Sequence, residues 1–313
     1  MSMHDGCCNL LLANNNDSGC QAVLANATNL LDIRAFEHMG RPVWSYGMYA
    51  YAKRAMHANV WQHNCCETCP QQSKPGIHVI SCHTATFPTE FSAHSVQQVY
   101  QTATHVYAQN LDRSKLNAKQ NAMTTALPLG LDLHAVSSSS RWGVKQTVPR
   151  EQYKLLCKLR STSQHAAARI RKVLVTWLPT STTSDRFASQ NYKSRPKLYN
   201  DCIANPNCAV GTGNRDETWK AMSQHAFVYS PIGVGFDCHR TWEALALGCI
   251  VIAQRNPALE AIFGDHPDLP IWFCDEPYTI DLQLLDKLVN TLKPVQLDQL
   301  CMPKFVLHAH TMS

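Results

Sequence analysis

The sequence contains little charge and no concentrated run of it. Of its 313 residues, 16% are charged, and 28 lysines and arginines against 23 acidic residues give a net charge of +5. Because the basic residues are scattered, they form no broad electrostatic surface for nucleic acid, and we expect no DNA or RNA partner. Local cations that bind a small anionic ligand fit this composition better.

The chain also lacks a long apolar run. It has no stretch of about 18 consecutive apolar residues, so we expect no membrane span. The opening residues 1–7 are polar, and we expect no export signal there. These features predict a cytoplasmic protein, and a secretory lumen stays open as a location if the N-terminus is incomplete.

Cysteine is abundant, at 14 residues, but its spacing shows no repeated framework. Cys65, Cys66 and Cys69 form one cluster, and no second pair at zinc-finger spacing accompanies it. We therefore expect no metal, with zinc at this cluster as the minor alternative. Cysteines inside apolar runs are predicted to be buried free thiols: Cys82, Cys249 and Cys274.

The apolar content is sufficient for two globular domains. Apolar residues make up 45% of the chain, and 313 residues exceed what one small core usually holds. A Ser-rich segment that ends in proline, residues 135–149, is typical of a linker. We predict domains at residues 1–144 and 145–313.

Short β-rich apolar runs alternate with helix-compatible stretches, which is the pattern of parallel α/β sheets. The predicted strands are residues 78–82, 105–108, 125–128, 172–177, 207–210, 227–229, 249–253 and 271–274. Helices are predicted over 150–172, with Leu155, Leu156 and Leu159 on one face, and over 279–292. The fold class is therefore α/β with Rossmann-like domains.

The most informative segment runs from Ser230 to Gly248 and predicts one strand–loop–helix–strand unit. Its loop holds Gly233 and Gly235, and Asp237 is expected to cap the helix. Gly248 is expected to end that helix in the left-handed conformation. The helix start would present free N–H groups and partial positive charge to the glycine loop, which predicts an anion site.

Two charged residues of this helix extend the predicted anion site. Arg240 can donate two parallel hydrogen bonds to a diphosphate, and Glu243 can accept hydrogen bonds from ribose hydroxyls. The structural alternative is an i,i+3 ion pair between Arg240 and Glu243, with Asp237 as a simple cap. Two glycines without a third at position 238 are a weak dinucleotide fingerprint, so spacing alone leaves both interpretations open.

The segment Ser-Pro-x-Gly-x-Gly-x-Asp-x-His-Arg-Thr-Trp-Glu-Ala-Leu-x-x-Gly, which begins at Ser230, resembles the donor site of exostosin-like glycosyltransferases. It is more loosely similar to that of α1,3-fucosyltransferases. Residues 107–110, 127–134 and 269–275 resemble other parts of the same proteins, and the resemblance covers residues 75–290. It implies the GT-B fold, in which two Rossmann-like domains face each other across a cleft.

The resemblance also implies an activity, the transfer of a sugar from a nucleotide-diphosphate sugar to a glycan or other hydroxyl acceptor. We expect the helix start and arginine to stabilise the leaving diphosphate, and the chain has no Asp-x-Asp motif, so no metal or further cofactor is expected. The expected donor contacts are Ser230, Gly233, Gly235, His239, Arg240, Glu243 and Arg186. Lys193 and Arg195 compete with Arg186 for the upstream basic position.

An inverting transfer, which the resemblance implies, needs a general base. Asp132 and His134 are the candidates because their turn is expected to end at the cleft, and His83 is the second choice. The turn residues could instead only hold the loop together. Two other functions stay open: a non-catalytic nucleotide-sugar or glycan-binding protein, and an NAD-linked oxidoreductase, although residues 1–50 lack the glycine fingerprint of the latter.

Overall fold

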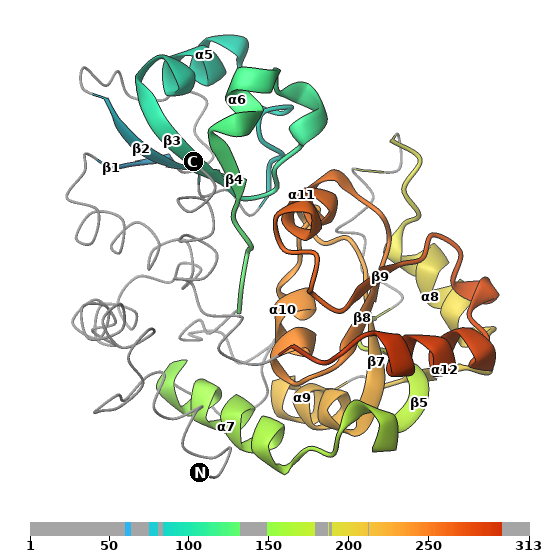
Figure 1. The fold of residues 1–313 in the computed structure, drawn as a ribbon. Coiled ribbons are helices and arrows are strands. Elements are labelled where there is room, and N and C mark those ends of the chain that lie inside the picture. The colour runs from blue at the N-terminus through green and yellow to red at the C-terminus, as the bar shows by residue number, and fades with distance from the viewer. Residues whose placement is uncertain are drawn as a thin grey trace.

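The computed structural model describes two parallel sheets with helices between their strands (Figure 1). The described residues are 60–63, 75–80, 84–131, 149–178, 187, 190–211 and 213–295. The predicted α/β class with Rossmann-like alternation is confirmed for these residues. The boundary predicted near residue 145 and the linker up to residue 148 lie outside them.

The first sheet has strand order β1-β2-β3-β4, and every pair is parallel. Its strands are β1 Val60–His63, β2 Gly76–Ile80, β3 Ala103–Ala108 and β4 Thr124–Ala126. The helices that connect them are α5 Ala93–Thr102, the 3-10 turn η1 Arg113–Lys115, and α6 Ala118–Ala122. Strand β1 was not predicted from the sequence.

The second sheet is also wholly parallel, in the order β6-β5-β7-β8-β9. Its strands are β5 Ile170–Val175, β6 Cys208–Val210, β7 His225–Ser230, β8 Ile250–Ala253 and β9 Ile271–Phe273. Its helices are α7 Pro149–Thr162, α8 Arg195–Ile203, α9 Arg215–Gln224, α10 His239–Ala246, α11 Pro257–Asp265 and α12 Leu282–Thr291. The 3-10 turns are η2 Ala166–Ala168 and η4 Pro277–Thr279. The helix predicted over 150–172 thus ends earlier than expected.

Helices cover both faces of the second sheet. Alternate residues of its strands point to opposite faces, so that Leu174 and Val228 pack with α9 and α10, whereas Val173 and Phe227 pack with α8 and α12. Leu156 of α7 is fully buried in the first of these clusters, as predicted for its apolar face. The residues at the centre of the sheet are therefore desolvated on both faces, which is why β8 and the buried half of β5 are continuous apolar runs.

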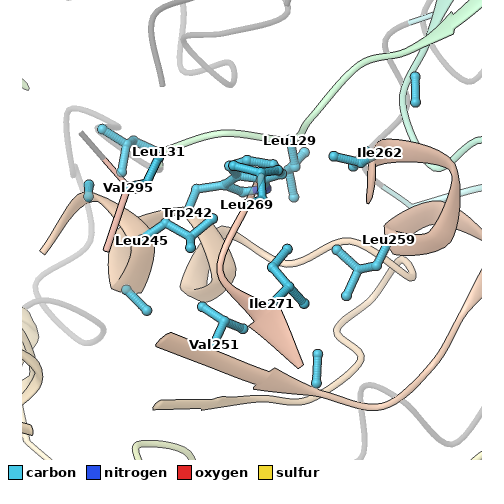
Figure 2. Packing of buried hydrophobic residues seen from close by; sticks show 14 of the residues in the cluster. Leu129, Leu131, Trp242, Leu245, Val251, Leu259, Ile262, Leu269, Ile271 and Val295 are labelled. Carbon is cyan, nitrogen blue, oxygen red and sulfur yellow. The ribbon is translucent and has the colours of Figure 1, made fainter. Parts of the chain in front are cut away.

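The two sheets are joined by apolar and polar contacts. Figure 2 shows Trp242 of α10 beside Leu129 of the segment that follows β4, and Leu245 belongs to the same cluster. Helix α11 lies against β4 (Figure 1), and its last residue, Asp265, accepts hydrogen bonds from Arg113 at 2.6 Å and from the Ala126 N–H at 3.0 Å. These contacts hold β4 against α11 and the segment after β4 against α10.

Candidate functional site

The site is centred on the predicted strand–loop–helix–strand unit, which the structure confirms as β7, a loop, α10 and β8. Gly248 has a φ of 79°, as expected for the residue that ends a helix in the left-handed conformation. Its N–H donates to the Leu245 carbonyl, and the Cys249 N–H donates to the Ala244 carbonyl, both at 2.9 Å. These two hydrogen bonds form the Schellman motif and fix the length of the helix.

Asp237 is not the helix cap that the sequence predicted. The N-cap is Cys238, whose side chain makes no capping hydrogen bond. The Asp237 carboxylate is buried and accepts hydrogen bonds from the N–H groups of Leu129 and Cys238 and from the Trp242 indole, at 2.6, 2.7 and 3.0 Å. Its own N–H donates to Asn110 Oδ1 at 2.7 Å. Burial raises the pKa of Asp237 to about 6 despite these donors.

His239 provides a second polar contact between α10 and the segment after β4. Its Nδ1 lies 2.7 Å from the carbonyl oxygen of Gly130. A carbonyl oxygen only accepts hydrogen bonds, so Nδ1 carries the proton and Nε2 is the basic nitrogen of the neutral ring. Ser230 is also held, because its hydroxyl is 2.8 Å from that of Thr241 in the first turn of α10.

Two arginines converge on the N-terminus of α10. Arg240 Nη1 and Arg195 Nη2 each lie 3.9 Å from Cys238 Sγ. Arg240 Nε also donates to the Thr176 hydroxyl at 2.6 Å, and Arg195 Nε donates to the Ile232 carbonyl at 2.9 Å. Burial, and then the charge of Arg240, lower the pKa of Arg195. Two positive charges are therefore held close together beside one thiol.

Among the described residues, no acidic side chain forms an ion pair with Arg240. The first turn of α10 contains no acidic residue. Helices α8 and α10 both begin without a side-chain cap, and Arg195 is the first residue of α8. The partial positive charges of uncapped helix starts add to those of the guanidinium groups.

The site lies at the topological switch point of the second sheet. The chain passes from β5 to β6 on one side of β5, and then returns to β7 on its other side. Thr176 follows β5 and Ser230 ends β7, so the Arg240–Thr176 hydrogen bond crosses this point. In open α/β sheets, ligands bind at the carboxyl ends of the strands where the strand order reverses.

The glycine loop lies directly against Arg195. The Gly233 N–H donates to the Gly235 carbonyl at 3.0 Å, which folds the loop back on itself. A Cβ at Gly233 would lie 3.4 Å from Arg195 Nη2. The glycine loop is therefore within van der Waals reach of the Arg195 guanidinium.

Glu243 faces the interior on the far side of the first helical turns. Its Oε1 accepts a hydrogen bond from Arg215 Nη2 at 2.5 Å, and its side chain is 10% exposed. Arg215 also donates to Gln152 Oε1 at 2.6 Å and lies over the ring of Trp219 at 4.7 Å. The ion pair of Glu243 is therefore with Arg215 and not with Arg240, and its predicted contact with ribose stays a prediction.

Several predicted residues lie outside the described part of the chain: Asp132, His134, Arg186, His83, Cys65, Cys66, Cys69 and Cys82. Of the two competitors for the upstream basic position, Lys193 forms ion pairs with Asp201 and Glu276. Arg195 instead contacts the glycine loop and Cys238. Cys249 and Cys274 are buried free thiols, as predicted.

Three contributors to the site were not identified from the sequence: Thr176, Asn110 and Arg215. Thr176 lies near the end of the strand predicted over 172–177, and polar residues at the carboxyl ends of parallel strands are a usable signal. Asn110 has a φ of 47°, a conformation in which asparagine is enriched, but its partner Asp237 is 127 residues away in sequence. No local sequence pattern indicated that Arg215 would pair with Glu243.

Comparisons with protein-family models and with curated proteins find no match. Within the described residues, no helix is both long and apolar enough to cross a membrane. In the same part of the chain, no group of three or more His, Cys, Asp and Glu side chains is arranged to hold a metal ion.

Proposed function

We propose that this protein is a GT-B glycosyltransferase that moves a sugar from a nucleotide-diphosphate sugar to a glycan or other hydroxyl acceptor. The observation that carries the proposal is the pair of arginines, Arg195 and Arg240, at the uncapped start of α10. The sequence resemblance of this segment to exostosin-like donor sites supports the same assignment. The two parallel sheets would then face each other across the donor and acceptor cleft.

A diphosphate suits the arginine pair better than a single carboxylate does. It offers two adjacent anionic groups, and arginine matches phosphate oxygens with two parallel hydrogen bonds. Hydrogen bonds to charged groups each contribute about 1.5–3 kcal/mol. During sugar transfer, negative charge builds on the leaving diphosphate, and fixed cations and helix-start N–H groups stabilise it without reorganisation.

The acceptor side of the reaction would lie on the segment that follows β4. Leu129 and Gly130 of this segment make hydrogen bonds to Asp237 and His239. Asp132 and His134 follow directly in sequence, which supports their candidacy as the general base for an inverting transfer. His239 Nε2 is the basic nitrogen of a ring that the Gly130 carbonyl already orients.

A thermal-shift screen against GDP-, UDP- and dTDP-sugars tests the donor site. We expect one nucleotide class to raise the melting temperature of the wild-type protein, because binding to the native state stabilises it. Arg195→Ala and Arg240→Ala should each abolish most of that increase. Arg171→Ala is the matched control, since Arg171 is about half exposed and pairs with Asp286 on the surface.

An activity assay then separates the enzyme from a non-catalytic binding protein. Release of the nucleoside diphosphate from the stabilising sugar nucleotide is followed in excess EDTA, with and without Mn²⁺. We expect the nucleoside diphosphate to be released in EDTA. The variants Asp132→Asn and His134→Gln should each lose this release but keep the thermal shift. A thermal shift without any release would identify a nucleotide-sugar-binding protein, and no shift with any nucleotide would reject the donor site.

A further inference from the structure

The turn between α8 and β6 brings two cysteines together, away from the donor loop. Cys202 lies near the end of α8, and Cys208 begins β6. The backbone of Asn205 connects them: its N–H donates to the Cys202 carbonyl, and its carbonyl accepts from the Cys208 N–H, both at 3.0 Å. The two cysteines therefore lie at the two ends of one short, hydrogen-bonded turn, and both pack in the same apolar cluster.

The turn is fixed in place by the side chain of Asn205. Its Nδ2 donates to the carbonyls of Pro277 and Ile280 at 2.9 and 2.8 Å, and its Oδ1 accepts from the Asn207 N–H at 2.8 Å. Asn205 is buried, so these hydrogen bonds are shielded from water. The backbone between the two cysteines is thus held against residues 277–280 by hydrogen bonds.

The two thiols differ in exposure and in acidity. Both are free, and Cys202 is fully buried whereas Cys208 is half-buried. A hydrogen bond from the Cys202 thiol, and then the charge of Lys172, lower the pKa of Cys208 against the opposing effect of burial. The same hydrogen bond and burial raise the pKa of Cys202. Cys208 is therefore the thiol that ionises and meets an oxidant first.

We propose that Cys202 and Cys208 form a reversible disulfide when the protein meets hydrogen peroxide, which makes this turn an oxidative modification site. The Cys208 thiolate attacks one peroxide oxygen, the O–O bond breaks, and Cys208 becomes a sulfenic acid while hydroxide leaves and takes up a proton to become water. The Cys202 sulfur then attacks the Cys208 sulfur, and the S–O bond breaks with loss of a second water. Two thiols are oxidised, the peroxide is reduced, and a dithiol reductant reverses the change.

A third thiol offers the competing pairing. Cys274 packs in the same apolar cluster as Cys202. Its charge contributes to the raised pKa of the Cys202 thiol. It follows β9, however, and no hydrogen bond between the backbones of Cys274 and Cys202 is present among the described residues. The Asn205 turn favours Cys208 as the partner.

Peptide mass spectrometry of the wild-type protein tests the proposal. Trypsin releases residues 198–215 as one peptide that contains both Cys202 and Cys208, because no lysine or arginine lies between Lys197 and Arg215. After treatment with hydrogen peroxide and alkylation, we expect this peptide to be two hydrogen masses lighter and unalkylated. Reduction with dithiothreitol before alkylation should restore two alkylated cysteines.

Two controls decide whether the fold directs the reaction. The disulfide should form at least tenfold faster in the folded protein than in the protein unfolded in urea. In Cys202→Ala, the Cys208 sulfenic acid should accumulate and react with dimedone, whereas Cys208→Ala should leave Cys202 unoxidised. Equal rates in the folded and unfolded protein, both cysteines still alkylated after oxidation, or a disulfide that links residues 198–215 to the peptide of Cys274 would each overturn the proposal.

Discussion

Gly248→Ala should destabilise the protein through the end of α10. Gly248 has a φ of 79°, and forcing an L-residue into the left-handed region costs about 1–2 kcal/mol. A Cβ would also lie 1.5 Å from Arg160 Nη1 and 2.5 Å from Arg160 Cζ. Arg160 would have to move and lose its 2.8 Å hydrogen bond to the Val295 carbonyl, which is a further loss of about 1 kcal/mol or more. The expected loss of unfolding free energy is therefore about 2–4 kcal/mol.

Gly264→Ala is the matched control for this substitution. Gly264 lies in the last turn of α11, and a Cβ there would meet nothing within 4 Å. Alanine is favoured over glycine in helices by up to about 1 kcal/mol, so this variant should be as stable as the wild type or slightly more stable. Urea unfolding followed by tryptophan fluorescence measures both variants. The reasoning would be refuted if Gly248→Ala lowered the unfolding free energy by less than about 0.5 kcal/mol. It would also be refuted if both variants changed the unfolding free energy by the same amount in the same direction.

Two further substitutions and one change of condition test the surroundings of the site. Glu243→Gln leaves the buried Arg215 without its anion and should lower the unfolding free energy by about 3–5 kcal/mol in urea titrations; a loss below about 1 kcal/mol would contradict a buried ion pair. The pKa of Asp237 is raised from 3.8 to about 6 on folding, so its stabilising contribution is complete below about pH 4 and is lost as the pH rises through 6. The stability advantage of the wild type over Asp237→Asn should therefore decrease by about 2 kcal/mol from pH 4 to pH 7, and a constant difference would rule this out. Donor turnover should persist in excess EDTA, and complete loss that Mn²⁺ restores would refute the metal-independent mechanism.

The local structure around α10 could be predicted from the sequence because its signals are local. Apolar runs gave β7 and β8, and Gly248 marked the end of the helix between them. The order of the strands could not be predicted, because pairing of parallel strands joins segments that are distant in sequence. The position of Thr176 at the switch point therefore became known only from the strand order in the structure.

Asp237 and Glu243 illustrate the limit for side chains. An aspartate just before a helix has the pattern of a cap, but its acceptor oxygens are occupied by the Leu129 N–H, 108 residues away, and by the Trp242 indole. Glu243 has Arg240 at i,i+3 spacing, yet its partner is Arg215 on another helix. In both cases, burial against a distant segment outweighed the weak local interaction that the spacing predicted.

Calorimetric titration with a nucleoside diphosphate tests the central claim most directly. The nucleoside that stabilises the protein in the thermal-shift screen is titrated as its diphosphate and as its monophosphate. Since each arginine contributes hydrogen bonds of about 1.5–3 kcal/mol, we expect the diphosphate to bind the wild type about 10- to 100-fold more tightly than the monophosphate. Arg195→Ala and Arg240→Ala should remove most of that difference, whereas Arg171→Ala should preserve it. Equal affinity of the wild type for both nucleotides, or an unchanged difference in the two arginine variants, would contradict a diphosphate site at the start of α10.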